Sequence, residues 1–179
     1  QDAQQFRWYG ANIPHELRGR DGRVLSRWGE PVWGALVARG KAAGRFDDEL
    51  VQAAVDLIQN RWPEGTRAAW VACIPSLRHP ELVPDFARRM ADALGIHFRD
   101  AIRKVRETEP QKEMENRFHQ CNNLDGAFIV DPELCYCDPV ILVDDAVDSA
   151  WTLTLATALL RQAGVDEVLP FALATTAAK

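Results

Sequence analysis

Long hydrophobic runs are missing from this sequence, and no apolar stretch approaches the roughly 20 residues that a membrane-spanning helix needs. The first ten residues contain no apolar segment of the kind found in signal peptides, so we expect a cytoplasmic protein with no membrane partner. Cysteine is scarce, with four in 179 residues, which favours free thiols or a metal site over a disulfide framework. The G-x-x-x-x-G-K-[ST] motif is also lacking, so these residues contain no P-loop for ATP.

The composition is that of a globular protein, with 47% apolar and 26% charged residues. The net charge of −5 is unevenly distributed: residues 1–45 hold eight basic against four acidic residues, and the remainder is acidic. A basic N-terminal region would attract an anionic partner such as nucleic acid, although arginines that cover apolar surface would give the same composition. No internal repeat or low-complexity tract is present.

Apolar spacing predicts alternating helices and strands. We expect helices over 33–41, 47–62, 80–96 and 151–164, and strands over 68–75, 97–103, 126–130, 140–145 and 167–174. Short connections between such elements are typical of a parallel sheet covered by helices. The sequence therefore predicts an α/β fold with a mainly parallel sheet over residues 46–179, preceded by a small basic extension or subdomain over residues 1–45.

Two adjacent carboxylates, Asp144 and Asp145, follow the buried strand that begins at Val140, and a helix starts a few residues later. Ligands bind at the carboxyl edge of a parallel sheet, and a helix N-terminus offers unpaired amides to a phosphate. Paired carboxylates can accept hydrogen bonds from ribose hydroxyls or hold Mg²⁺. This segment therefore predicts a ribose-phosphate site.

The stretch "VILVDDAVDSAWTL" (140–153) resembles the phosphoribosyl-diphosphate signature of the type I phosphoribosyltransferases. The resemblance implies that Asp144 and Asp145 face the ribose hydroxyls and that Ser149 and Thr152 contact the 5′-phosphate, with Mg²⁺ bound alongside phosphoribosyl diphosphate. It also implies a diphosphate loop in "CIPSLRHPEL" (73–82), with Ser76 and Arg78 as its contacts. Residues 110–130 are similar to a segment of ComF-type members, in which Gln111, Arg117 and Asn123 match the pattern.

Three residues depart from that signature. Asp148 stands where a hydroxyl residue is usual, and it would either repel a phosphate or cap the following helix. Ala150 replaces a glycine whose backbone can require a positive φ. Trp151 either narrows the mouth of the site or packs as a core aromatic at the helix start. These departures favour a domain that is not catalytic by itself, with an active transferase as the alternative.

Four motifs together carry a narrower resemblance: "RWGEPVWGALVARG", "IPSLRHPELV", "DDAVDSAWTLT" and "LLRQAGVDEVLPFALA". They are similar to the C-terminal phosphoribosyltransferase-like domain of bacterial RecQ-like DNA helicases. This resemblance implies an accessory domain that helps to engage or position DNA in repair and recombination, near the bacterial nucleoid. Its partners would be DNA and the ATP-dependent helicase core of the same polypeptide. A protein–protein docking module is a further alternative.

Basic residues in two regions are candidates for contacts to DNA phosphates. They are Arg7, Arg18, Arg20, Arg23 and Arg27 in the N-terminal region and Arg103, Lys104 and Arg106 further along. Aromatic residues near the first group could stack on unpaired bases, but for Trp28 and Trp33 we favour a place in the core.

A candidate zinc site is formed in the sequence by His119, Cys121, Cys135 and Cys137. Imidazole and thiolate ligands suit tetrahedral zinc, but C-x-C is a weaker signal than C-x₂-C. Free thiols beside a loop are the alternative that we favour.

Overall fold

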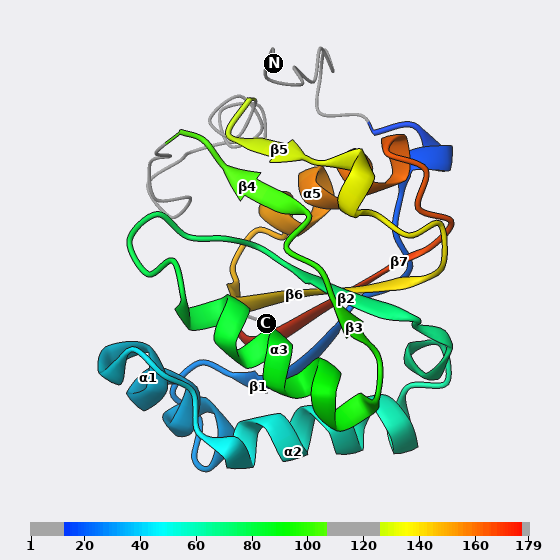
Figure 1. Cartoon of the computed structure of the whole chain (residues 1–179). Coiled ribbons are helices and arrows are strands. Elements are labelled where there is room, and N and C mark those ends of the chain that lie inside the picture. The colour runs from blue at the N-terminus through cyan, green and yellow to red at the C-terminus, as the bar shows by residue number, and fades with distance from the viewer. Residues whose placement is uncertain (1–12, 107–125, 177–179) are drawn as a thin grey trace.

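The computed structural model describes residues 13–106 and 126–176, which form a mainly parallel sheet flanked by helices (Figure 1). The predicted fold class is therefore confirmed. The central sheet contains β1 (Arg23–Arg27), β2 (Trp70–Cys73), β3 (His97–Phe98), β6 (Val140–Val147) and β7 (Val168–Thr175). Its strand order is β1-β7-β6-β2-β3, and each neighbouring pair is parallel. The helices are α1 (Trp33–Ala43), α2 (Asp48–Asp56), α3 (Leu82–Leu94) and α5 (Trp151–Gln162).

Two apolar layers cover the two faces of this sheet, and β2 shows how the sequence divides between them. Val71 and Cys73 point into the layer that packs against α1, α2 and α3. Trp70 and Ala72 point into the opposite layer with α5. Figure 1 shows α1, α2 and α3 on one side of the sheet and α5 on the other. Because alternate residues on a strand face opposite sides, a strand buried on both faces is continuously apolar, as β2 is.

A second, two-stranded sheet lies on the α5 side, where β4 (Ile102–Lys104) pairs antiparallel with β5 (Phe128–Val130). The single strand predicted over 97–103 is therefore wrong, because the chain leaves the central sheet after β3 and enters the small sheet at β4. The strand predicted over 126–130 exists but belongs to the small sheet. Both kinds of strand bury apolar residues, so the sequence pattern did not distinguish them.

The described part of the N-terminal region is built into the central sheet. Strand β1 forms its edge beside β7, after a short 3₁₀ turn, η1 (His15–Leu17). Val37 of α1 and Leu50 of α2 lie in the same core cluster, on either side of the predicted boundary between residues 45 and 46. That boundary itself stays a prediction. Trp33 packs against this core as expected, whereas Trp28 is 40% exposed, contrary to our interpretation.

Shorter elements complete the described chain: η2 (Leu57–Arg61), a π-helical turn that prolongs α2, η3 (Gly65–Arg67) and η5 (Pro132–Leu134). Among the described residues, no helix is long and apolar enough to span a membrane.

Candidate functional site

The sheet changes winding direction between β2 and β6. The chain leaves β2 for α3 on one face, whereas it leaves β6 for α5 on the other, so a crevice opens at the carboxyl ends of these two strands. Strand β6 pairs with β2 only as far as Val143 but with β7 as far as Val147. The last residues of β6 therefore border a cleft of about 180 Å³.

The cleft brings together residues that are far apart in the sequence. Its lining includes Lys41, Ile74, Pro75, Ser76, His79, Leu82, Val83, Lys104, Phe128, Asp144, Asp145, Ala146 and Thr152. Four residues predicted for a ribose-phosphate site are thus collected here: Ser76, Asp144, Asp145 and Thr152. Lys104, which we predicted as a nucleic-acid contact, also lines the cleft, and its ammonium lies 5.7 Å from the centre of the Phe128 ring.

Asp144 and Asp145 occupy different environments although they are neighbours in β6. Asp144 is only 8% exposed, and its Oδ1 accepts a 2.8 Å hydrogen bond from the backbone N–H of Asp145. Burial, followed by the charge of Asp145, raises the pKa of the Asp144 carboxyl well above its usual range. Both residues line the cleft, but Asp144 is buried and its surroundings disfavour ionisation, whereas Asp145 is half-buried.

Lys41 of α1 was not predicted as a site residue. Its Nζ lies 2.6 Å from Oδ2 of Asp145 and 5.8 Å from the centre of the Trp28 ring. The sequence offered no signal for this pairing, because Lys41 lies at the end of an ordinary helix about a hundred residues before Asp145. Only the packing of α1 against the sheet brings the two side chains together.

The residues around the paired carboxylates do not fit a resident Mg²⁺ ion. Mg²⁺ requires near-octahedral oxygen coordination, usually from one or two carboxylates together with substrate phosphates and waters. One oxygen of Asp144 already accepts a backbone hydrogen bond, and one oxygen of Asp145 is held by the Lys41 ammonium. A divalent cation would have to displace that ammonium or lie beside a like charge.

The loop between β6 and α5 keeps the backbone turn that the signature implies. Ala150 has a φ of +60°, in the left-handed region that glycine usually occupies. The carbonyl of Ala150 accepts bonds from both the N–H and the hydroxyl of Thr154, which closes the first turn of α5. The prediction that this position needs a positive φ is therefore confirmed, with alanine carrying the strain.

Asp148 does not cap α5. The residue at the helix N-cap is Ala150, and no side chain caps this end. Instead, the Asp148 carboxylate accepts a 2.8 Å hydrogen bond from the hydroxyl of Thr176, just beyond β7. Ser149 is half-buried. Trp151 is half-buried against the α5-side core, as our interpretation of a core aromatic expected.

The loop after β2 contributes Ser76 and His79 to the cleft. Ser76 Oγ accepts a hydrogen bond of 3.3 Å from the backbone N–H of His79, which tightens the turn. Arg78 is exposed and is not part of the described cleft lining. The predicted diphosphate contacts are thus divided, with Ser76 in the cleft and Arg78 at the surface beside it.

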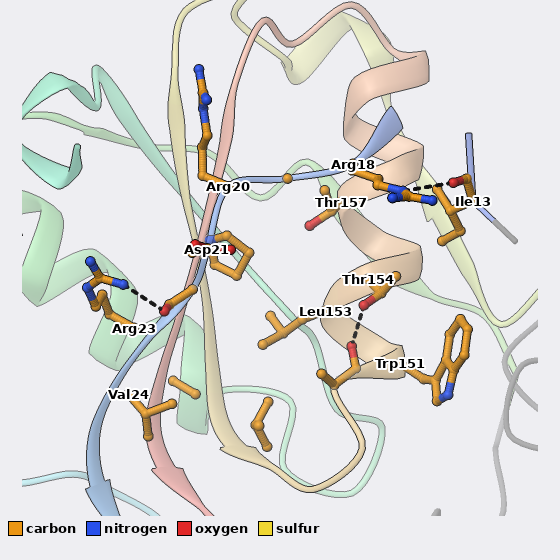
Figure 2. Close-up of a pocket in the computed structure, with 16 residues that line it drawn as sticks. Ile13, Arg18, Arg20, Asp21, Arg23, Val24, Trp151, Leu153, Thr154 and Thr157 are labelled. Atoms are coloured by element: carbon orange, nitrogen blue, oxygen red, sulfur yellow. Dashed lines mark hydrogen bonds between the residues drawn. The ribbon is translucent and has the colours of Figure 1, made fainter. Parts of the chain in front are cut away.

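A larger cavity of about 490 Å³ lies between α5 and residues 18–24 (Figure 2). Its walls are mainly apolar, and Ala150 and Trp151 of the loop border it. Thr157 is only 2% exposed, and its hydroxyl has no hydrogen-bond partner among the described residues. In Figure 2, Arg20 and Arg23 stand at the rim with their guanidinium groups turned away from the cavity.

Several predicted DNA contacts already have partners within the protein. Arg18 donates to the carbonyl of Ile13, Arg20 forms an ion pair with Glu167, and Arg23 lies 5.9 Å from the centre of the Trp62 ring. Arg27, Arg103 and Arg106 are exposed. Arg7 lies outside the described residues.

Two of the four predicted zinc ligands, Cys135 and Cys137, belong to the described part of the chain. His119 and Cys121 lie outside the described residues, as do Gln111, Arg117 and Asn123. Cys135 donates from Sγ to the carbonyl of Asp131, and burial raises its pKa to about 11. Cys137 is exposed. No group of three or more metal-binding side chains occurs in the described part of the chain.

Solved structures with a similar arrangement include two described as phosphoribosyl enzymes. Adenine phosphoribosyltransferase matches 72% of this chain over 71% of its own length, with 19% identity and a TM-score of 0.49. Glutamine phosphoribosylpyrophosphate amidotransferase from B. subtilis, in complex with ADP and GMP, matches 69% of the chain with 18% identity and a TM-score of 0.47.

A third match is the allosteric regulatory enzyme of purine biosynthesis, over 70% of the chain with 18% identity and a TM-score of 0.46. The chain spans only 25% and 26% of the lengths of this enzyme and the amidotransferase. No family model matches the sequence, and no curated protein matches it.

Proposed function

We propose that the cleft between β2 and β6 binds a 5-phosphorylated ribose such as phosphoribosyl diphosphate. The observation that carries this proposal is that Ser76 and Thr152 line one cleft together with the acidic pair, at the start of α5. The loop that leads from β6 into this helix has a positive φ at Ala150. An alanine in this conformation costs about 1 kcal/mol, so the turn persists against its local preference. Backbone strain of this kind is concentrated at functional sites.

In this proposal each part of the cleft has one role. Asp145 accepts hydrogen bonds from the ribose hydroxyls. Asp144 holds the backbone of Asp145 in place by accepting the hydrogen bond from its N–H. Thr152 and Ser149, with the loop amides, contact the 5′-phosphate at the positive end of α5. Ser76 contacts the diphosphate, with Arg78 beside it. The hydroxyl of Thr176 holds the Asp148 carboxylate at the end of β7.

We further propose that the chain binds this ligand without transferring its ribosyl group. The Lys41–Asp145 ion pair and the poor fit to Mg²⁺ support this view. An active phosphoribosyl-diphosphate-dependent transferase is the alternative, and a docking module is the third possibility.

Calorimetry with phosphoribosyl diphosphate tests the binding proposal. We expect saturable binding at one site, weakened by about tenfold in Thr152→Val, which removes one phosphate contact. Absence of heat with the unaltered protein would refute the proposal. Release of diphosphate in the presence of a panel of nucleobases would instead establish the transferase.

A second proposed function is that of an accessory domain in a bacterial RecQ-like DNA helicase, acting near the nucleoid in repair and recombination. The exposed side chain of Trp28, next to the exposed Arg27, favours contact with unpaired bases and phosphates. The sequence motifs support the helicase context.

Fluorescence anisotropy with forked and single-stranded DNA at two salt concentrations tests this second function. We expect salt-sensitive binding that Arg27→Ala weakens and Arg61→Ala, at an exposed site on η2, leaves unchanged. Binding that is absent, or that does not respond to salt, would contradict it. Removal of this domain from the parent polypeptide should lower DNA binding or unwinding.

A further inference from the structure

The ammonium of Lys41 lies inside the cleft, at the carboxylate proposed to face the ribose. Its Nζ is 2.6 Å from Oδ2 of Asp145, and the two side chains are 38% and 15% exposed. Both residues line the same small cavity with Ser76 and Thr152. Lys41 is therefore a positive charge at the point where the ribose and phosphate groups of a ligand would meet the acidic pair.

The position of Lys41 is fixed by close packing of α1. A Cβ added at Gly34 would lie 1.9 Å from the carbonyl oxygen of Arg27, and one at Gly40 would lie 2.7 Å from the Phe46 ring. Two glycines thus let α1 approach β1 and the chain just before α2 more closely than any other residue would permit. The ring of Trp28, 5.8 Å from Nζ, flanks the lysine on another side.

We infer that Lys41 takes the place of a divalent cation, so that the cleft binds its phosphorylated ribose without Mg²⁺. This inference rests on the proposed function of the cleft. A lysine ammonium has three N–H donors, of which one satisfies Asp145 and two remain for phosphate or hydroxyl oxygens. The ammonium neutralises the Asp145 charge, which would otherwise repel a phosphorylated ligand.

The same geometry disfavours a metal ion. A cation entering the cleft meets an ammonium already bound to Asp145, and Asp144 lies buried with one oxygen engaged by a backbone N–H. Two positive charges a few ångströms apart repel each other, and the repulsion is stronger where the protein limits their contact with water. In this inference, Lys41 removes the need for Mg²⁺ in the cleft, which goes beyond forming an ion pair with Asp145.

Two titrations test this inference. In the first, phosphoribosyl diphosphate is added to the protein in EDTA and in Mg²⁺, and we expect the same affinity in both. Lys41→Met should lose affinity in EDTA by about tenfold or more and recover part of it with Mg²⁺. Arg39→Met, which removes a charge from the exposed side of the same helix, should behave as the unaltered protein.

In the second, Mn²⁺ binding to the ligand-free protein is followed by electron paramagnetic resonance. Lys41→Met should bind Mn²⁺ about tenfold more tightly than the unaltered protein, because the competing ammonium is gone. Equal Mn²⁺ affinity in the two proteins, or sugar-phosphate binding that requires Mg²⁺ in the unaltered protein, would overturn the inference. Failure of phosphoribosyl diphosphate to bind under any condition would refute the proposed function and metal-free binding of this ligand. An intact Mn²⁺ difference would then still show that Lys41 excludes a divalent cation from the acidic pair.

Discussion

Single residues in this protein carry costs that their surroundings impose. Ala150 is held at a φ of +60° by the turn into α5, and Thr157 buries a hydroxyl that has no partner among the described residues. Neither cost can be seen in the residue type, since alanine and threonine are ordinary in loops and helices. Both residues border the cavity between α5 and residues 18–24, and Ala150 also belongs to the proposed phosphate loop.

Replacing Ala150 by glycine should raise the free energy of unfolding by about 1 kcal/mol, because glycine adopts a positive φ without steric cost. Urea unfolding followed by circular dichroism measures the change. Ala163, with a φ of −75°, provides the control, and Ala163→Gly should be neutral or destabilising. A loss of stability in Ala150→Gly would mean that the side chain contributes more than the strain costs.

Thr157→Val should be neutral or should stabilise the fold by about 1 kcal/mol, since it removes an unsatisfied hydroxyl and keeps the side-chain shape. Thr154→Val on the same helix is the matched comparison, because its hydroxyl donates to the carbonyl of Ala150 and its loss should destabilise. Thermal unfolding should therefore give a lower melting temperature for Thr154→Val and an equal or higher one for Thr157→Val. If Thr157→Val were clearly destabilising, the hydroxyl would have a partner, such as a bound water, in solution.

At the scale of elements, α1 links the packing of the fold to the chemistry of the cleft. Its residues Gly34 and Gly40 bring it close to β1 and to the chain before α2, and Lys41 extends from its last turn to Asp145. The helical pattern of residues 33–41 predicted this element correctly. Lys41 reaches the cleft only because of the strand against which α1 packs. The helical pattern of residues 33–41 does not indicate which strand that is.

Gly34→Ala should destabilise the protein by more than 2 kcal/mol, although alanine ordinarily favours a helix interior over glycine by about 1 kcal/mol. The added Cβ would lie 1.9 Å from a backbone oxygen of Arg27, which cannot move without disturbing β1. Chemical denaturation of the variant measures this loss. Ala35→Gly, at an exposed position of the same helix, should cost no more than about 1 kcal/mol. A more stable Gly34→Ala would show that α1 is not held this closely.

For the whole molecule, the burial of Asp144 links stability to pH. Its folded pKa is raised above the unfolded value of 3.8, so the folded state holds the proton more tightly. This contribution to stability is complete below the unfolded pKa and is lost as the pH rises through the folded pKa.

Asp144→Asn removes this titration and keeps an oxygen that can accept the bond from the Asp145 N–H. The free energy of unfolding of the variant should therefore increase relative to that of the unaltered protein as the pH rises from 4 towards 8. Unfolding curves across this range measure the difference, with the exposed Asp138→Asn as the control. A difference that stays constant, or that shrinks with rising pH, would show that Asp144 is stabilised as a carboxylate.

Local patterns in the sequence determined most of the individual elements and the identity of the acidic pair. Continuous apolar runs marked β2 and β6, helical spacing marked α1, α3 and α5, and the signature identified Asp144, Asp145 and the need for a positive φ at Ala150. Those properties depend on neighbouring residues, so they can be read along the chain. The strand over 97–103 was wrong because leaving one sheet for another depends on distant pairing partners.

The tertiary structure alone decided what surrounds the acidic pair. The strand order places β2 beside β6, the small sheet brings Lys104 to the cleft, and the close approach of α1 sets Lys41 against Asp145. It also directed Asp148 to Thr176 rather than to the helix end. Pairing and packing between distant segments follow from burial of the whole core. A short stretch of sequence therefore does not determine which charged side chains come into contact.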